Sequence, residues 1–130
     1  MQLVGHFSKD IIETLNLSVE ENTPIYIGEV NETHMRSRHK YEYDKYRANL
    51  SQILEYPDYV GISPHDNSVM YVKEYIEADE YIRVGVKVSG NGLYFARTLH
   101  LLSTYNAERY IEKGTLKKVD NLNWFCIIKV

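Results

Sequence analysis

The chain has 130 residues, of which 44% are hydrophobic and only three are proline, and this composition excludes a disordered tail and fits one folded domain. Its formal net charge of −3 argues against nucleic-acid binding driven by overall charge, because such domains are usually basic. The sequence has no apolar run long enough to cross a membrane, no secretory signal at its start, and a single cysteine, Cys126. We therefore expect a cytoplasmic protein with one domain over residues 1–130 and no membrane contact.

The first half of the chain predicts mainly helices. Residues 9–15 form a short amphipathic segment, and residues 24–28 are typical of a brief strand. Asn31 or Thr33 can cap a helix that begins near His34. A second helix follows and ends before Tyr56-Pro57, since a residue that precedes proline avoids helical geometry. Its apolar side chains recur at steps of three and four: Tyr43, Tyr46, Leu50, Ile53 and Leu54.

The second half predicts strands. Residues 69–76, 81–88 and 93–102 alternate or are rich in β-branched and aromatic residues. Residues 105–113 indicate a helix that ends at a glycine, and the apolar residues 124–130, which contain the cysteine, predict a last buried strand. Because hairpins join the strands, we expect an α+β fold with the N-terminal helices on one face of a mostly antiparallel β-sheet.

The turn at residues 89–92, Ser-Gly-Asn-Gly, predicts a hairpin in which Val88 pairs with Leu93. That register gives the sheet one apolar face and one polar, basic and aromatic face. The predicted core face carries Ile82, Val84, Val86, Val88, Leu93, Phe95, Arg97 and Leu99. The predicted polar face carries Tyr81, Arg83, Gly85, Lys87, Tyr94, Ala96, Thr98 and His100. Arg97 is then out of place, because an unpaired buried guanidinium costs several kcal/mol. It must pair with a carboxylate, reach a sheet edge or line a pocket open to an anion.

The sequence offers no familiar metal or cofactor motif. It lacks a cysteine pair, a His-Glu-x-x-His segment and an aspartate-rich calcium loop, and His34 and His39 are spaced less favourably than ligands four residues apart. A phosphate-binding glycine loop and the serine-hydrolase elbow are also missing. We therefore expect no metal and no cofactor.

The segment His34-Met35-Arg36-Ser37-Arg38-His39 carries the most chemistry. Histidine exchanges protons near neutral pH, and arginine is the best two-pronged donor to a phosphate. On a helix, His34 and Arg38 share a face and His39 lies near its rim. A proton-transfer group beside a fixed cation is what general acid–base cleavage of a phosphodiester requires. A solvated basic helix would explain the same spacing without any function.

Basic and hydroxyl side chains of the second half complete the candidate set. Lys87 lies on the predicted polar face, and three consecutive residues with hydroxyl groups, Ser103, Thr104 and Tyr105, follow the last hairpin strand. Arg97 lines an anion pocket if it neither pairs with a carboxylate nor reaches a sheet edge. His100 belongs to no motif and alternates onto the polar face, where we expect it to be solvated.

Two segments resemble a known family. The His34–His39 segment, followed by residues 51–61 with the turn Tyr56-Pro57-Asp58-Tyr59, is similar to phage-type members of the barnase–EndoU–colicin–RelE superfamily. The similarity covers roughly residues 25–118, and one departure is tyrosine at position 56, where asparagine is more usual. The resemblance implies an α+β fold with a β-meander and a metal-independent ribonuclease, often a toxin or phage effector.

The favoured hypothesis is a metal-independent endoribonuclease that cleaves RNA by attack of the 2′-hydroxyl. The expected catalytic residues are His34, Arg38, His39 and Thr104, and the expected substrate contacts are Lys87, Arg97, Ser103 and Tyr105. His34 is the expected base that removes the hydroxyl proton and His39 the expected acid that protonates the leaving oxygen, with the reverse assignment equally open. The expected partners are RNA and an immunity or antitoxin protein.

The alternative is a non-catalytic domain on the same fold that binds protein or nucleic acid, which the negative charge favours. ADP-ribosyl transfer would need a glutamate motif near an arginine, and none is recognisable.

Overall fold

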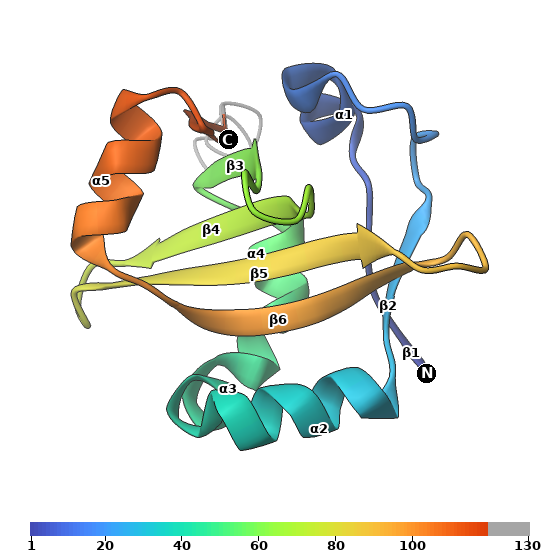
Figure 1. Ribbon diagram of the computed structural model, residues 1–130, viewed down its shortest axis with the longest axis horizontal. Helices are drawn as coiled ribbons and strands as arrows, with labels where there is room; N and C mark the ends of the chain where they lie inside the picture. Colours follow the sequence, from blue (N-terminus) through green and yellow to red (C-terminus); the bar gives the residue numbers. More distant parts are fainter. Residues whose placement is uncertain (120–130) are drawn as a thin grey trace, which may run out of the picture.

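In the computed structural model, which describes residues 1–119, seven strands form one sheet in the order β1-β2-β6-β5-β4-β3-β7 (Figure 1). Neighbouring strands are antiparallel except β2 and β6, which are parallel. The strands are β1 (Gln2–His6), β2 (Pro24–Ile27), β3 (Tyr59–Ile62), β4 (Val69–Tyr75), β5 (Glu80–Val88), β6 (Tyr94–Leu102) and β7 (Leu116–Lys118). The helices are α1 (Lys9–Leu15), α2 (Glu29–Arg38), α3 (Lys40–Tyr46), α4 (Leu50–Glu55) and α5 (Thr104–Glu112), with a 3-10 turn at Arg47–Asn49.

The predicted α+β class with a mostly antiparallel sheet is confirmed. The predicted helix at residues 9–15 is α1, and the two predicted hairpin strands are β5 and β6 within one residue at each end. Strands β1, β3 and β7 are short and were not predicted. The predicted strand at residues 124–130, with Cys126, lies outside the described residues. No helix within residues 1–119 has the length and apolar character that crossing a bilayer requires.

Helix α2 begins earlier than the sequence predicted, at Glu29 rather than near His34. Gly28 is the N-cap, and the side-chain oxygen of Asn31 accepts a hydrogen bond of 2.9 Å from its backbone N–H. Asn31 therefore does cap the helix, but by reaching back from the first turn. Glu29 and Glu32 in this turn favour the same start, because carboxylates stabilise the positive end of a helix.

The predicted second helix is broken into α3, the 3-10 turn and α4, yet its apolar stripe is confirmed. Tyr46, Leu50, Ile53 and Leu54 are all buried and pack into the main core beneath the sheet. The break changes the direction of the helix axis, yet these side chains stay buried. The helix ends at Glu55, as predicted from the proline two residues later.

Side chains of the N-terminal helices α1 to α4 enter one core, whereas the late helix α5 packs on the opposite face of the sheet. The main core lies on the face behind β5 and β6 in Figure 1, where α4 crosses them, and includes Ile82, Val84, Val86 and Leu99. A smaller core on the opposite face lies under α5 and contains Met70, Val72, Leu102, Ala107 and Leu116. Because α5 covers only one end of that face, the helices of residues 1–119 leave the rest of it open (Figure 1).

The hairpin register differs from the predicted one in two places. Val88 pairs with Tyr94 rather than Leu93, so the loop covers residues 89–93. A β-bulge then leaves Arg97 without a partner, opposite the step from Gly85 to Val86. Since a slip of one residue reverses the faces, Tyr94 and Ala96 join the core side and Phe95 moves to the open face. Beyond the bulge, Leu99 returns to the core as predicted.

Gly61 in β3 allows β7 to approach closely. A Cβ atom at this position would lie 2.0 Å from the backbone oxygen of Thr115. We expect Gly61→Ala to force β3 and β7 apart and to lower the free energy of unfolding by about 1–3 kcal/mol, measured from the urea midpoint. Gly90→Ala, at a loop position where an added Cβ meets nothing within 4 Å, is the control. An unchanged midpoint for Gly61→Ala would contradict this packing.

Candidate active site on the open face of the sheet

Two histidines from distant parts of the chain stack at the edge of β6. Strand β2 pairs with β6 only at Tyr94 and Phe95, and α2 and α3 run alongside the remainder of that edge (Figure 1). His39 is the residue between the two helices. Its ring lies on that of His100, with 4.9 Å between centroids and 24° between planes. The turn between α2 and α3 thus delivers an imidazole to the open face.

Glu42 fixes this turn to the sheet. Its Oε2 atom accepts a hydrogen bond of 3.0 Å from the backbone N–H of Leu101 on the β6 edge, and the same oxygen lies 3.5 Å from Nδ1 of His39. The side chain is only 12% exposed. A single shielded carboxylate therefore satisfies an edge donor of the sheet and lies beside the ring of His39, which stacks on His100.

Arg83 lies beside this pair, because it is the β5 residue directly opposite His100. Its Nη2 donates a hydrogen bond of 3.3 Å to Oγ of Ser63. Its Nε is buried and has no hydrogen-bond partner within residues 1–119. Burial lowers the pKa of the guanidinium, and the Asp66 carboxylate partly opposes this effect. Arg83 therefore has a donor free for a further acceptor.

His100 is partly buried, so the expectation that it is solvated was wrong. Burial, the Arg83 guanidinium and His39 together lower the pKa of His100 to about 4, while Glu42 acts in the opposite direction. Its Nδ1 is also buried without a partner in the described part of the chain. At neutral pH, His100 is consequently an uncharged imidazole next to a fixed cation.

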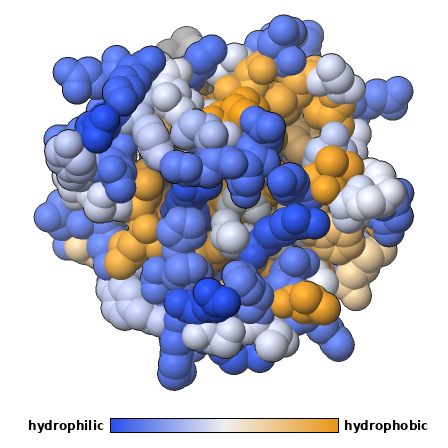
Figure 2. Space-filling model, viewed as in Figure 1, coloured by the Kyte–Doolittle hydropathy of each residue, from blue (hydrophilic) through white to orange (hydrophobic). Residues whose placement is uncertain are grey.

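Hydroxyl groups and one carboxylate extend the polar surface along β5. Gly85 leaves room for Thr98, since a Cβ at the glycine would lie 2.6 Å from the threonine Oγ1. Asp66 accepts hydrogen bonds from the backbone and the hydroxyl of Ser68, and these lower its pKa. Lys87 is close enough to add to that effect. Figure 2 shows hydrophilic side chains across the middle of this face.

Helix α2, which carries the predicted residues His34 and Arg38, runs along the β6 edge of this surface. His34 and Arg38 are exposed and share one side of the helix with Asn31, at steps of three and seven. Asn31 lines a shallow surface pocket together with Phe95 and Arg97. His34 and Arg38 thus face solvent, and the bulge leaves Arg97 exposed as well, which removes the cost of burying it.

The predicted hydroxyl residues lie at the start of α5. Ser103 is its N-cap, and its Oγ accepts a hydrogen bond from the backbone N–H of Asn106. Thr104 is exposed, and Tyr105 is 66% exposed with its hydroxyl bonded to Arg109. Within residues 1–119, no hydrogen bond or ion pair joins these three residues to the histidine pair.

Of the predicted residues, the structure therefore brings His39 to the open face, with Lys87 further along β5. It adds His100, Arg83 and Glu42, which the sequence reasoning did not select. Arg83 and His100 already shared the predicted polar face, so the signal was present, but their pairing depends on the bulge. The described residues contain no group of three or more His, Cys, Asp or Glu side chains arranged to hold a metal ion.

Comparison with protein families gives one match over nearly the whole chain. The model of the family described as phage-Barnase-EndoU-ColicinE5/D-RelE like nuclease 3 matches residues 2–120. No curated protein and no solved structure matches the chain.

The environment of His100 predicts a dependence of stability on pH. Because the pKa of His100 is lowered to about 4 from its ordinary 6.5, the unfolded chain binds more protons, and the free energy of unfolding falls as the pH decreases from 6.5 to 4. Compared with wild type, His100→Gln should lose less stability over this range in urea titrations. The charged groups facing the ring are Arg83, His39 and Glu42, and Arg83→Gln should raise the pKa of His100 in an NMR titration. Parallel stability curves for wild type and His100→Gln would contradict the assignment.

Proposed function

Because the chain belongs to the phage-Barnase-EndoU-ColicinE5/D-RelE like nuclease 3 family, we propose that it is a metal-independent endoribonuclease whose active site is the open face of the sheet. The observation that carries the proposal is the stacked pair of His39 and His100 beside Arg83. Two imidazoles supply the acid and the base that attack by a 2′-hydroxyl requires. The guanidinium supplies the fixed positive charge that the phosphoryl oxygens require.

The proposed reaction assigns one role to each group. Neutral His100 takes the proton from the 2′-hydroxyl, and the resulting oxygen attacks the adjacent phosphorus. Arg83 stabilises the negative charge that builds on the non-bridging oxygens. His39 donates its proton to the leaving 5′-oxygen, so that the strand is cut and a 2′,3′-cyclic phosphate remains. Binding the anionic phosphate beside His100 favours the protonated ring, which makes this imidazole a stronger base in the complex.

Glu42 is a positioning residue in this scheme. We expect its carboxylate, 3.5 Å from Nδ1 of His39, to favour a proton on that nitrogen and so to leave Nε2 as the nitrogen that carries the reacting proton. Because the same oxygen is tied to the Leu101 N–H, the orientation of His39 is set by the sheet itself. This is the logic by which a buried carboxylate orients a catalytic histidine.

The remaining candidate residues have proposed roles in binding the RNA backbone. His34, Arg38 and Arg97 border the site along α2 and β6, and Lys87 continues it along β5. Ser103, Thr104 and Tyr105 are proposed phosphate contacts at the far end of β6. The sequence-based alternative, in which His34 rather than His100 is the base, is decided by the variants below.

The second candidate is a non-catalytic binding domain on the same fold, and the net charge of −3 favours it. A role as a toxin or phage effector, with an immunity or antitoxin partner in the cytoplasm, is a further proposal that depends on the nuclease activity.

The first prediction of this mechanism concerns cleavage of single-stranded RNA in excess chelator. Activity should persist and leave 2′,3′-cyclic phosphate ends, detected by mass spectrometry. His39→Gln and His100→Gln should each lower kcat about 10²- to 10⁴-fold, the usual contribution of a positioned acid or base.

His6→Gln, at an exposed histidine of β1, is the matched control, and His34→Ala should cost far less than the loss of either stacked histidine. If His34→Ala is as damaging as His39→Gln while His100→Gln is active, His34 is the base. If folded wild-type protein cleaves no RNA, the enzyme hypothesis is rejected in favour of the non-catalytic binding domain.

The second prediction concerns Glu42→Gln, which keeps an acceptor for the Leu101 N–H and removes the charge that faces His39. We expect kcat to fall at least about tenfold with KM little changed, because the histidine loses its preferred tautomer. The ¹⁵N chemical shifts of His39 should report a mixture of tautomers. Glu29→Gln, at an exposed position on α2, should change neither. A purely structural Glu42 would lower stability and leave the tautomer and kcat of the folded protein unchanged.

A further inference from the structure

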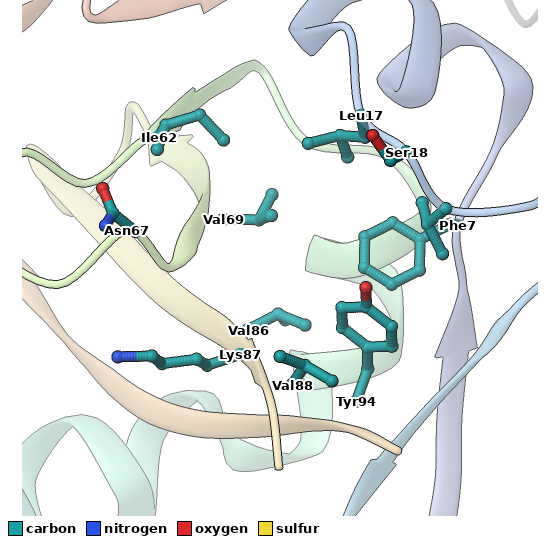
Figure 3. A pocket seen from close by; sticks show the side chains of 11 residues that line it. Phe7, Leu17, Ser18, Ile62, Asn67, Val69, Val86, Lys87, Val88 and Tyr94 are labelled. Atoms are coloured by element: carbon teal, nitrogen blue, oxygen red, sulfur yellow. The ribbon is translucent and has the colours of Figure 1, made fainter. Parts of the chain in front are cut away.

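A second concave site lies at the hairpin end of β5, beyond the last pairing of β4. Its volume is about 280 Å³. Figure 3 shows that side chains from the loop after α1, from the loop between β3 and β4 and from the β5–β6 hairpin surround one space. The residues that matter most below are Phe7, Asn67, Val86, Lys87, Val88 and Tyr94. The pocket is lined mainly by apolar side chains, with polar groups at its rim.

We propose that this pocket receives a nucleobase of the RNA strand that is cleaved at the histidine pair. The inference rests on the proposed function for the class of ligand, and it adds a base-recognition site to a surface that otherwise offers contacts to phosphate. Three observations carry it: the size and wall of the pocket, the polar groups at its rim, and the strand and loop that it shares with the site on the open face.

The size and the walls suit a flat ring. The volume lies just below the roughly 300–1,000 Å³ of pockets for drug-sized ligands, so the site fits one ring system better than a longer chain. Phe7 and Tyr94 pack edge to face, with 4.9 Å between centroids and 74° between planes. Phe7 is fully buried, while Tyr94 is only partly buried and presents its ring to the space. Aromatic and aliphatic walls of this kind receive unstacked bases in proteins that bind single-stranded RNA.

The rim supplies groups that can read a base edge. Asn67 is exposed, and its amide offers both a donor and an acceptor, the combination that pairs with base edges. Its backbone has φ of 62°, a left-handed conformation that asparagine and glycine tolerate. Ser18 adds a hydroxyl across the pocket. A purely apolar ligand would leave these groups unused.

The pocket lies at the edge of β5 beyond its last pairing with β4, where the two faces of the sheet meet. Val86 and Tyr94 line it from the side of the main core. Lys87 lines it and lies on the same side of β5 as Arg83, four residues away, which is roughly 13 Å along a strand. The loop between β3 and β4 contributes Ser63 to Arg83 and Asn67 to the pocket. An RNA strand that passes around this edge of β5 can therefore place a phosphate at Arg83 and a nearby base in the pocket, with Lys87 between them.

The test uses the full-length protein and the four 5′-nucleoside monophosphates AMP, GMP, CMP and UMP as probes. Methyl NMR spectra should show the resonances of Val86 and Val88 shifting with at least one of them, and with different affinity for different bases. Val88→Trp, at a rim position that is 44% exposed, should fill the pocket and abolish these shifts. Asn67→Gly keeps the backbone conformation and should weaken the preferred nucleotide about tenfold. Asn22→Gly, at another asparagine with positive φ, is the matched control.

The possible outcomes are separate from those of the cleavage assay. If nucleotides shift only the NMR resonances of His39, His100 and Arg83, they bind through phosphate alone, and the proposal is overturned. Magnetisation transfer from the Trp124 indole to the Val86 and Val88 methyl groups, with no effect of nucleotides, would identify the chain's own C-terminal segment as the occupant and also overturn it. Base-selective shifts that Val88→Trp removes support the pocket, even if no cleavage is seen and the proposed nuclease activity fails.

Discussion

The short pairing of β2 with β6 is the constraint on which the rest of the structure depends. Only Tyr94 and Phe95 are paired, so most of the β6 edge would expose unpaired backbone groups unless another element covered it. Helices α2 and α3 cover this edge, and the carboxylate of Glu42 accepts the N–H that a longer β2 would have bound. This arrangement brings His39 to His100. A fully paired β6 would leave no place for a side chain from the N-terminal third at the edge of the open face.

The bulge at Arg97 is the second condition for the site. An extra residue in β6, opposite the Gly85–Val86 step, turns Arg97 outward and keeps Leu99 in the core. The same offset places Thr98 and His100 on the open face, with His100 opposite Arg83. Bulges frequently redirect side chains next to active sites. Here a single bulge removes the need to bury Arg97 and places His100 opposite Arg83. The burial that results is what lowers the pKa of both His100 and Arg83.

The periodicity of apolar residues predicted those helices and strands whose formation depends on residues close in sequence. The stripe from Tyr46 to Leu54 and the strands of the central hairpin followed from their periodicity and were confirmed. The register did not follow, because a five-residue loop and a bulge each shift it by one position and neither leaves a clear mark in the sequence. The contact of His39 with His100 could not be predicted from local patterns either. It depends on α2 and α3 covering the edge of β6, which is distant from them in sequence. The resemblance to the nuclease superfamily, by contrast, was confirmed by the family match.

The joining of two separate segments at the β6 edge also has a consequence for how the protein folds and opens. Strands β4, β5 and β6 form a meander of local contacts, whereas α2 and α3 reach it only through long-range contacts, which form slowly because a large loop must close first. The meander can therefore be complete before the N-terminal helices dock. Local opening of α2 and α3 at equilibrium would separate the histidines while the sheet stays intact. In a chain synthesised from its N-terminus, the pair of histidines cannot form until β6 has been made, about 60 residues after His39.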